Sequence, residues 1–397
     1  MYNIRIYMYY LQSISRFLLF TFLCCFIYVD FVLAKNGDTS SSKLSAKGVV
    51  DTGYLGGSGV SDGYFSALLD LEYGADASEG RSGFKGFIRL HPYVSSARFL
   101  PFDIIERVSI EFSDRKFGLF EIGKHAGVAS SMKVDAFSAA GMTRDSLYWF
   151  AQFDHTMHTC NSEYCQFSAI YSPDLFSNNV DYYTQSNGEF VNLGRDKRRD
   201  FKLSYISQDF SGLKFGISYI PGFEERRSEK IISYSNVLQC SIFYAGQIND
   251  VAYKFSVSYE GAGSYKDPVS GQLSNPLFGF EAGANIAYMG VTIGASTGFL
   301  GKSYSMKGEN SKSSSYNTLG LGYKIGPFGV GVSYFNSVKY LNEMASKFDR
   351  IAFGLNYKFS NNILSSLEIS RFNLNFGSIP DNSSQGCMVL ISAKFKF

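Results

Sequence analysis

The sequence has little charge, little proline and a single tryptophan. Among its 397 residues 18% are charged, 8 are proline, and the formal net charge is +2. So small a net charge creates no strong field for a polyanion, and we expect no nucleic-acid partner. Beyond the N-terminal segment, no apolar run approaches the roughly 18 residues that a membrane-spanning helix needs. The sequence therefore excludes helical spans from the mature chain.

The sequence is rich in Tyr, Phe and Gly instead. It contains 28 Tyr, 37 Phe and 39 Gly, and aromatic residues make up 17% of the chain. Aromatic side chains favour β-strands, and glycine favours turns. This composition is typical of β-structure with many turns and with aromatic belts at membrane surfaces.

Residues 1 to 34 have the order of features found in a secretory signal peptide. Arg5 and Arg16 lie in a polar start, residues 17 to 29 are apolar, and Ala34 ends a plausible cleavage site. We expect cleavage before Lys35, which leaves a mature chain of residues 35 to 397. Two of the six cysteines lie in the signal segment, and export would place the other four in an oxidising compartment.

The last stretch, residues 386 to 397, reads GCMVLISAKFKF and alternates apolar with mostly polar side chains. In a strand, this alternation puts Val389, Ile391, Ala393, Phe395 and Phe397 on one face. An apolar strand at an open sheet edge would pair with other chains. A membrane barrel removes the edge, because its last strand pairs with its first and its apolar face meets lipid. We therefore expect this stretch to close a transmembrane antiparallel β-barrel.

The rest of the chain contains more segments of this kind, and the connections between them alternate in length. Including the last stretch, we count sixteen segments, at residues 44–54, 64–73, 82–92, 104–113, 117–124, 199–207, 212–220, 237–247, 250–261, 276–288, 290–300, 316–325, 327–337, 349–359, 361–373 and 386–397. Short turns, as at Gly326-Pro327, alternate with long polar loops, as from Val338 to Phe348. Short periplasmic turns and longer outer loops are typical of outer-membrane barrels. The pattern predicts an all-β fold with sixteen strands, a polar lumen and both termini in the periplasm.

One connection, residues 125 to 198, is far longer than the others. Loops of this length are usually functional or disordered, and its many aromatic residues, Trp149 among them, argue against disorder. Either it folds partly into the lumen, or it supplies an extra pair of strands and makes the barrel eighteen-stranded.

Several short stretches resemble the general porins of Gram-negative bacteria, a family of sixteen-stranded outer-membrane channels that assemble as homotrimers. They are residues 44–48 (LSAKG), 81–86 (RSGFKG), 117–124 and 205–219, with the terminal Phe397 as a fifth point of similarity. The resemblance implies that the barrel-assembly machinery recognises the C-terminal strand at Phe395 and Phe397. It also implies a third loop, here residues 125 to 198, that folds inward to form a constriction.

In that family, basic residues on the barrel wall face carboxylates of the third loop across the constriction. The wall positions correspond to Lys47, Arg81, Arg107 and Arg198. Alternation along the strands supports this independently, because each of the four is out of phase with its apolar neighbours. For the acidic side we choose Asp135 and Asp145, which follow the strand at residues 117–124 most closely.

Other motifs carry weaker functional interpretations. Cys160 and Cys165 lie five residues apart in the long connection and predict a local disulfide; with His155 and His158 a metal site is the lesser alternative. Cys240 and Cys387 lie at apolar-face positions and are expected to be unpaired. Leu300-Gly301-Lys302-Ser303 lacks the first glycine of a phosphate-binding loop, and we expect neither metal nor cofactor.

The resemblance and the alternation together imply a porin in the outer-membrane lipid. It would allow passive diffusion of ions and small hydrophilic solutes through a water-filled, charge-lined pore. The alternative is a surface antigen or adhesin whose outer loops bind host surfaces. His91 and His125 have no evident nucleophile partner in the sequence, and we expect no enzymatic activity.

Overall fold

The computed structural model describes residues 43–57, 60–75, 82–90, 93–95, 105–141, 174–175, 180–183, 192–196, 200–227, 230–267, 271–303, 305–309, 312–341, 344–376 and 383–396. Antiparallel strands make up most of this part. The strands of the large sheet are β1 (Lys43–Gly57), β2 (Val60–Ala75), β3 (Gly83–Leu90), β4 (Tyr93–Ser95), β5 (Ile105–Asp114), β6 (Gly118–Lys124), β9 (Phe201–Ile206), β10 (Leu213–Arg227), β11 (Lys230–Ile248), β12 (Val251–Ala262), β13 (Leu277–Tyr288), β14 (Val291–Gly301), β15 (Ser314–Ile325), β16 (Phe328–Leu341), β17 (Met344–Lys358), β18 (Ile363–Phe376) and β19 (Ser383–Lys396).

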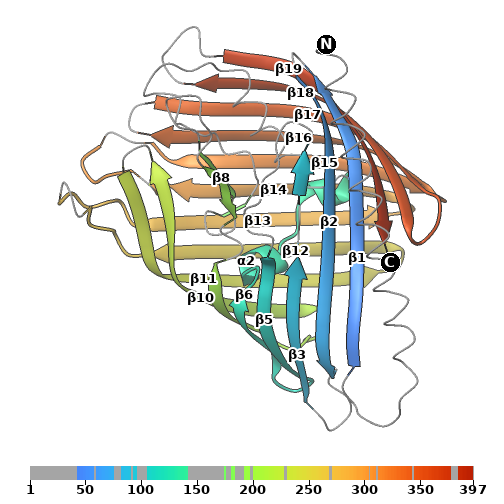
Figure 1. The fold of residues 1–397 in the computed structure, drawn as a ribbon, viewed down its shortest axis with the longest axis horizontal. Helices are drawn as coiled ribbons and strands as arrows, with labels where there is room; N and C mark the ends of the chain where they lie inside the picture. The colour runs from blue at the N-terminus through green and yellow to red at the C-terminus, as the bar shows by residue number, and fades with distance from the viewer. Residues whose placement is uncertain are drawn as a thin grey trace, which may run out of the picture.

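The large sheet closes on itself. β1 pairs with β2 on one side and with β19 on the other, where Val50 lies opposite Phe395. β3 and β4 both pair with β2 and form two pieces of one spanning strand. The 17 strands of the sheet therefore make a barrel of sixteen spanning strands, as predicted (Figure 1). The first and last strands are thus hydrogen-bonded to each other, as a barrel that spans hydrocarbon requires.

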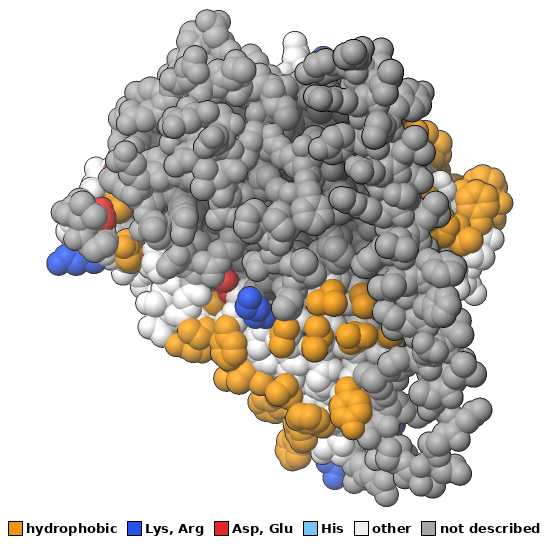
Figure 2. Space-filling view, in the orientation of Figure 1, with side chains coloured by type: hydrophobic (Ala, Val, Ile, Leu, Met, Phe, Trp, Pro, Cys, Tyr) orange, Lys and Arg blue, Asp and Glu red, His pale blue; other side chains and the backbone are white. Residues whose placement is uncertain are grey.

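The two faces of the strands differ in chemistry. On β10, Phe215, Ile217 and Tyr219 are exposed on the outer face, whereas Ser218 between them is buried on the inner face. The same alternation recurs on neighbouring strands, and Figure 2 shows hydrophobic side chains in rows on the described lower part of the barrel. A period of two puts apolar groups toward lipid and polar groups toward the lumen.

Short turns join the strands at one end, as predicted. β11 and β12, β13 and β14, and β15 and β16 are each joined by two residues, since Ile248 pairs with Val251, Tyr288 with Val291 and Ile325 with Phe328. These turns contain left-handed backbone at Asn249, Gly290 and Gly326, the conformation that two-residue hairpins demand.

At the other end, the prediction of long loops is partly wrong. Residues 338–341 and 344–348 are paired strand rather than loop, because the β16–β17 ladder continues to Leu341 opposite Met344. The β10–β11 ladder likewise continues to Arg227 opposite Lys230. The prediction relied on apolar residues at every second position, and the polar residues in these stretches interrupt that pattern. The backbone hydrogen bonds of a ladder do not require an apolar face.

The long connection holds four described elements: α2 (Val128–Ser131), α3 (Ala136–Ala139), β7 (Val180–Tyr183) and β8 (Asn192–Asp196). β7 and β8 form a separate two-stranded sheet, so they do not enlarge the barrel to eighteen strands. α2 contacts β9 to β12, and α3 contacts β13 to β16. In Figure 1, α2 lies between the front strands and the back strands of the barrel. Among the described residues, no helix combines the length and apolar character needed to cross a membrane.

Candidate functional site

The first part of the long connection, residues 125–141, lies against the inner wall of the barrel, and we call it the inner segment. Four hydrogen bonds to inward-facing side chains hold its backbone along the wall from β10 to β17. They are Val128 N to Ser218 Oγ (2.9 Å), Val134 N to Ser256 Oγ (2.7 Å), Asn285 Nδ2 to Asp135 O (3.0 Å) and Asn356 Nδ2 to Gly141 O (2.7 Å). The inner segment therefore narrows the lumen from one side.

Glycines on the wall let the inner segment lie this close. A Cβ atom at Gly283 would be 1.8 Å from the carbonyl oxygen of Val134, and one at Gly320 would be 2.0 Å from that of Ala136. At Gly331 the distance to the Ala140 carbonyl oxygen would be 2.0 Å. These glycines face inward on β13, β15 and β16, and together they form a groove that we call the glycine groove. The surface of the groove is backbone alone. The backbone of the inner segment can lie this close only because these positions carry no side chain.

Asp135 is one of the two predicted acidic residues, and it caps α3. Its carboxylate accepts a hydrogen bond from Ser138 N at 2.8 Å, and the residue is only 2% exposed. Acceptance from a backbone amide in the first turn is the usual role of an N-cap residue. The Asp135 carboxylate is thus turned toward the first turn of α3 rather than toward the lumen.

A buried ion cluster lies beside α3. Lys133 Nζ lies 2.7 Å from Glu281 Oε2, 3.2 Å from Asp174 Oδ1 and 3.1 Å from Tyr316 Oη. The charged side chains are between 2% and 4% exposed. Asp174 lies 41 residues after Lys133 in the long connection, so the cluster ties two separate parts of that connection to β13 and β15.

The opposite wall, from β1 to β6, carries a row of charged residues in register. Lys47 lies opposite Asp70, Asp70 opposite Arg89, and Arg89 opposite Arg107. The flanking Ile88 is exposed on the outer face, so this row faces the lumen. We call it the basic row.

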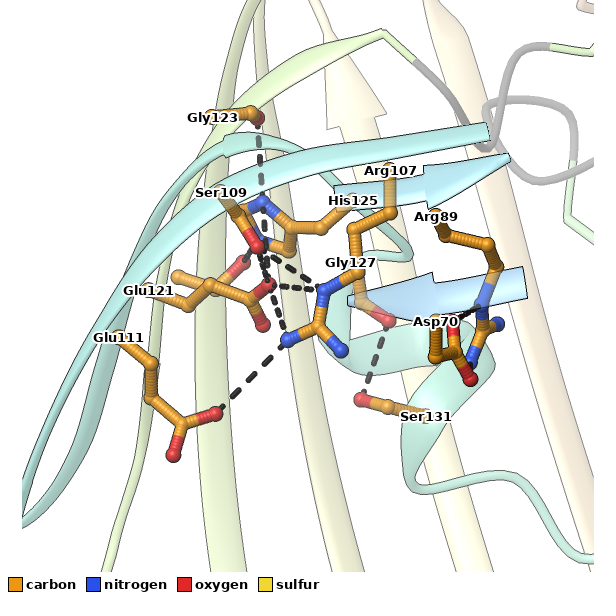
Figure 3. Close-up of polar contacts among 11 residues, drawn as sticks. Asp70, Arg89, Arg107, Ser109, Glu111, Glu121, Gly123, His125, Gly127 and Ser131 are labelled. Carbon is orange, nitrogen blue, oxygen red and sulfur yellow. Dashed lines mark hydrogen bonds and ion pairs between the residues drawn. The ribbon is translucent and has the colours of Figure 1, made fainter. Parts of the chain in front are cut away.

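Carboxylates hold both arginines of this row (Figure 3). Arg89 donates from Nε and Nη2 to the two oxygens of Asp70, at 2.5 and 3.0 Å. Arg107 donates from Nε to Glu121 Oε1 at 2.8 Å, and its Nη2 lies 2.6 Å from the same oxygen and 3.7 Å from Glu111 Oε2. Paired contacts of guanidinium with carboxylate fix orientation as well as charge.

Two further contacts complete the surroundings of Arg107. Its guanidinium carbon lies 4.0 Å from the centre of the Phe87 ring, and Ser109 Oγ accepts from its Nε at 2.9 Å. On the same wall, Lys85 Nζ lies 2.6 Å from Glu72 Oε1. Cations and carboxylates are therefore interleaved on this face.

His125 joins the charged wall to the inner segment. Its Nε2 lies 2.8 Å from Ser204 Oγ, which lies 2.6 Å from Ser218 Oγ, the acceptor for Val128 N. Burial lowers the pKa of His125 from 6.5 to about 4, a shift that the nearby Glu121 opposes. The His125 ring is therefore neutral near pH 7, and it links β9 to the start of the inner segment through hydrogen bonds.

Several predicted residues lie outside the described part of the chain: Arg81, Arg198, Asp145, Cys160, Cys165 and Phe397. Of the described ones, Phe395 is exposed on the outer face, and Lys47 and Arg107 lie on the inner face. Cys240 is a free thiol, as predicted. Among residues that the structure describes, no three His, Cys, Asp or Glu side chains gather as a metal site requires.

Sequence reasoning missed Arg89, Asp70 and the glycine groove. Arg89 has the inward parity that identified Arg107, since it alternates with Ile88 and Leu90. Glycines at inward positions, such as Gly320 and Gly331, were a second available signal. Neither signal says which wall the inner segment contacts.

A closed sixteen-strand barrel with an apolar exterior, a charged interior and an inward-folded segment defines an outer-membrane channel. A sequence model of the Gram-negative porin family matches residues 28–376. The chain belongs to this family.

Individual relatives are distant. An uncharacterized protein of Rickettsia bellii is 22% identical over 343 residues, which cover 72% of this chain and 75% of the relative. Among solved structures, OmpF of Salmonella typhi in complex with daunomycin has a TM-score of 0.61 at 12% identity, covering 90% of this chain and 98% of that one. The trimer form of OmpT of Vibrio cholerae has a TM-score of 0.51 at 10% identity, covering 90% and 100%. At such identities the structures establish the fold alone.

Proposed function

We propose that this protein is a passive diffusion channel for ions and small hydrophilic solutes. The observation that carries the proposal is the arrangement of the lumen. The basic row lies on β1 to β5, and the inner segment occupies the wall from β10 to β17. Solutes would pass between them. Charged groups along a narrow aqueous path select by charge and by ease of dehydration, and apolar solutes would have to displace ordered water.

The family membership and the barrel support a channel rather than an enzyme. In this proposal, Lys47, Arg81, Arg107 and Arg198 line the basic side, and residues 125–198 form the constriction. Asp145 is the remaining acidic candidate from the sequence, because Asp135 caps α3.

The proposal includes export and orientation. Residues 1–34 would act as a signal peptide and residues 35–397 would form the barrel. Both termini would lie in the periplasm, because β1 begins and β19 ends at the short-turn end. The barrel-assembly machinery would recognise the last strand through Phe395 and Phe397, and the barrel would assemble as a homotrimer. The trimer form of the Vibrio cholerae neighbour supports the last point by analogy.

Planar bilayers test the channel directly. Purified, refolded protein should insert in discrete conductance steps, and liposomes that contain it should swell in small sugars faster than in large ones. An electrically silent membrane, with the barrel shown to be folded by heat-modifiable migration in gels, would contradict a channel. It would favour the surface-antigen alternative, which predicts a plugged lumen.

Charge reversal tests the position of the basic side. Replacing Arg81 and Arg107 by Glu should move the reversal potential in a salt gradient toward cation preference, because anionic side chains attract cations into the path. An unchanged reversal potential would place these two residues outside the constriction.

A further inference from the structure

The described charges on the wall from β1 to β6 balance one another. Four cations face the lumen there, namely Lys47, Lys85, Arg89 and Arg107, and four carboxylates face it with them, namely Asp70, Glu72, Glu111 and Glu121. A purely basic wall would attract anions strongly. Here each arginine contacts a carboxylate of the same wall at hydrogen-bonding distance, which sharply reduces the field that a passing ion meets.

Glu121 occupies the central place in this balance. Its Oε1 accepts from Arg107 Nε at 2.8 Å and from Ser109 Oγ at 2.5 Å, and it lies 2.6 Å from Arg107 Nη2. The Arg107 side chain is 23% exposed, whereas that of Glu121 is 12% exposed. The guanidinium therefore presents the more accessible charge, with the carboxylate behind it.

We propose that Glu121, together with Glu111, determines the ion preference of the pore by masking Arg107. The inference rests on the proposed channel function and assigns selectivity to carboxylates of the barrel wall itself. Loss of the Glu121 charge would leave Arg107 with the more distant Glu111 as its remaining carboxylate in the described wall. Loss of the Arg107 charge would leave Glu111 and Glu121 next to each other in register.

The substitution Glu121→Gln removes the negative charge of this side chain without changing its size. A Gln side chain keeps an oxygen that can accept from Arg107 Nε and from Ser109 Oγ, so the hydrogen-bonded geometry can persist while the charge is removed. Asp250→Asn is the matched control. Asp250 is exposed in the two-residue turn between β11 and β12, away from the charged wall, and its substitution removes the same charge from the chain.

The experiment compares reversal potentials of four variants in planar bilayers with a KCl gradient centred near 0.1 M. Glu121→Gln should raise the permeability ratio of chloride to potassium by about 5- to 16-fold. One unit charge about 5 Å from an ion in water changes the entry of chloride and of potassium by about fourfold each, in opposite directions, and screening at 0.1 M reduces the effect. Arg107→Gln should lower the ratio by a similar factor, and the double variant should return near the wild-type value. Asp250→Asn should leave the ratio unchanged.

The salt dependence of the shift in permeability ratio is a second measurement. A purely structural role of Glu121 would not make this shift depend on salt. Since the Debye length falls from about 10 Å at 0.1 M to about 3 Å at 1 M, the shift should shrink at high salt. If Glu121→Gln conducts normally but its permeability ratio equals that of the wild type and of Asp250→Asn, the inference is wrong while the channel stands. If wild-type protein does not conduct, the proposed function itself fails.

Discussion

Individual residues of the lumen divide into those that meet water and those that hold the inner segment. Arg89 and Arg107 belong to the first group, because both side chains are partly exposed and bound to carboxylates. His125 and Asp135 belong to the second, because both are buried and bonded to backbone. Residue type alone does not separate the groups, since a carboxylate can line a pore or cap a helix.

His125 should make the stability of the barrel depend on pH. Its pKa is about 4 in the folded protein and 6.5 as the ordinary value, so the unfolded chain binds more protons between these values. Stability is therefore present above pH 6.5 and is lost as the pH falls toward 4, by about 3 kcal/mol at most. Thermal unfolding in detergent at pH 8 and pH 5 measures the loss.

His125→Gln is the control for this pH dependence. Gln can bond to Ser204 but does not titrate, so the difference in unfolding temperature between the two pH values should become smaller. An identical difference in the variant would assign the pH dependence to other groups. Glu121, Lys202 and Arg107 face the ring and are unchanged in the variant.

At the scale of elements, the glycine groove and the inner segment form one packed unit. Helices as short as α2 and α3 have little stability of their own. They persist because their backbone lies on the wall and wall side chains bond to it. We therefore expect the inner segment to be fixed in place rather than to act as a swinging gate.

Gly331→Ala tests this packing. A methyl group at Gly331 would lie 2.0 Å from the carbonyl oxygen of Ala140, so the inner segment must move off the wall. We expect a changed single-channel conductance with more current noise, and a loss of stability of roughly 1 to 3 kcal/mol, the usual cost of overpacking.

Gly329→Ala is the matched control on the same strand and the same face. There the nearest atom to an added Cβ is 3.7 Å away, at Asn356, which is ordinary contact. The control should conduct like the wild type. Equal conductance traces from both variants would show that the inner segment is not held by the groove.

At the scale of the whole molecule, the buried Lys133 cluster connects parts that are far apart in the chain. Asp174, Glu281 and Tyr316 come from the long connection, β13 and β15, and all three bind Lys133. A second buried pair, Arg350 with Glu368, joins β17 to β18 on the inner face. The Lys133 contacts hold two described parts of the long connection, at Lys133 and Asp174, against the barrel wall.

Lys133→Met should destabilise the folded channel. It leaves Asp174 and Glu281 buried without their cation, and removal of one partner from a buried pair costs about 3 to 5 kcal/mol. Urea unfolding in detergent or lipid, followed by tryptophan fluorescence or gel migration, measures the effect. Lys214→Gln is the control, because its pair with Asp209 is exposed and such pairs contribute about 1 kcal/mol or less. Similar midpoints for the two variants would contradict the role assigned to the cluster.

The sequence by itself determined the sixteen strands and the direction in which their side chains point. Phe215, Ile217 and Tyr219 alternate with inward residues because lipid lies on one side and water on the other. That constraint acts on each strand separately, so a local period of two is enough to reveal it.

Only the tertiary structure decided which wall the inner segment contacts, which carboxylate masks Arg107, and that Asp135 caps a helix. The first of these depends on contacts such as Val134 with Gly283 and Lys133 with Glu281, between residues more than a hundred positions apart. The other two join residues that are close in sequence, Arg107 with Glu121 and Asp135 with Ser138, but other acidic residues nearby could have taken either role. The polar interior imposes no simple period, because water, a charge or a glycine can each occupy an inward position. Their arrangement follows from closure of the barrel, which brings distant strands to face one another across the lumen.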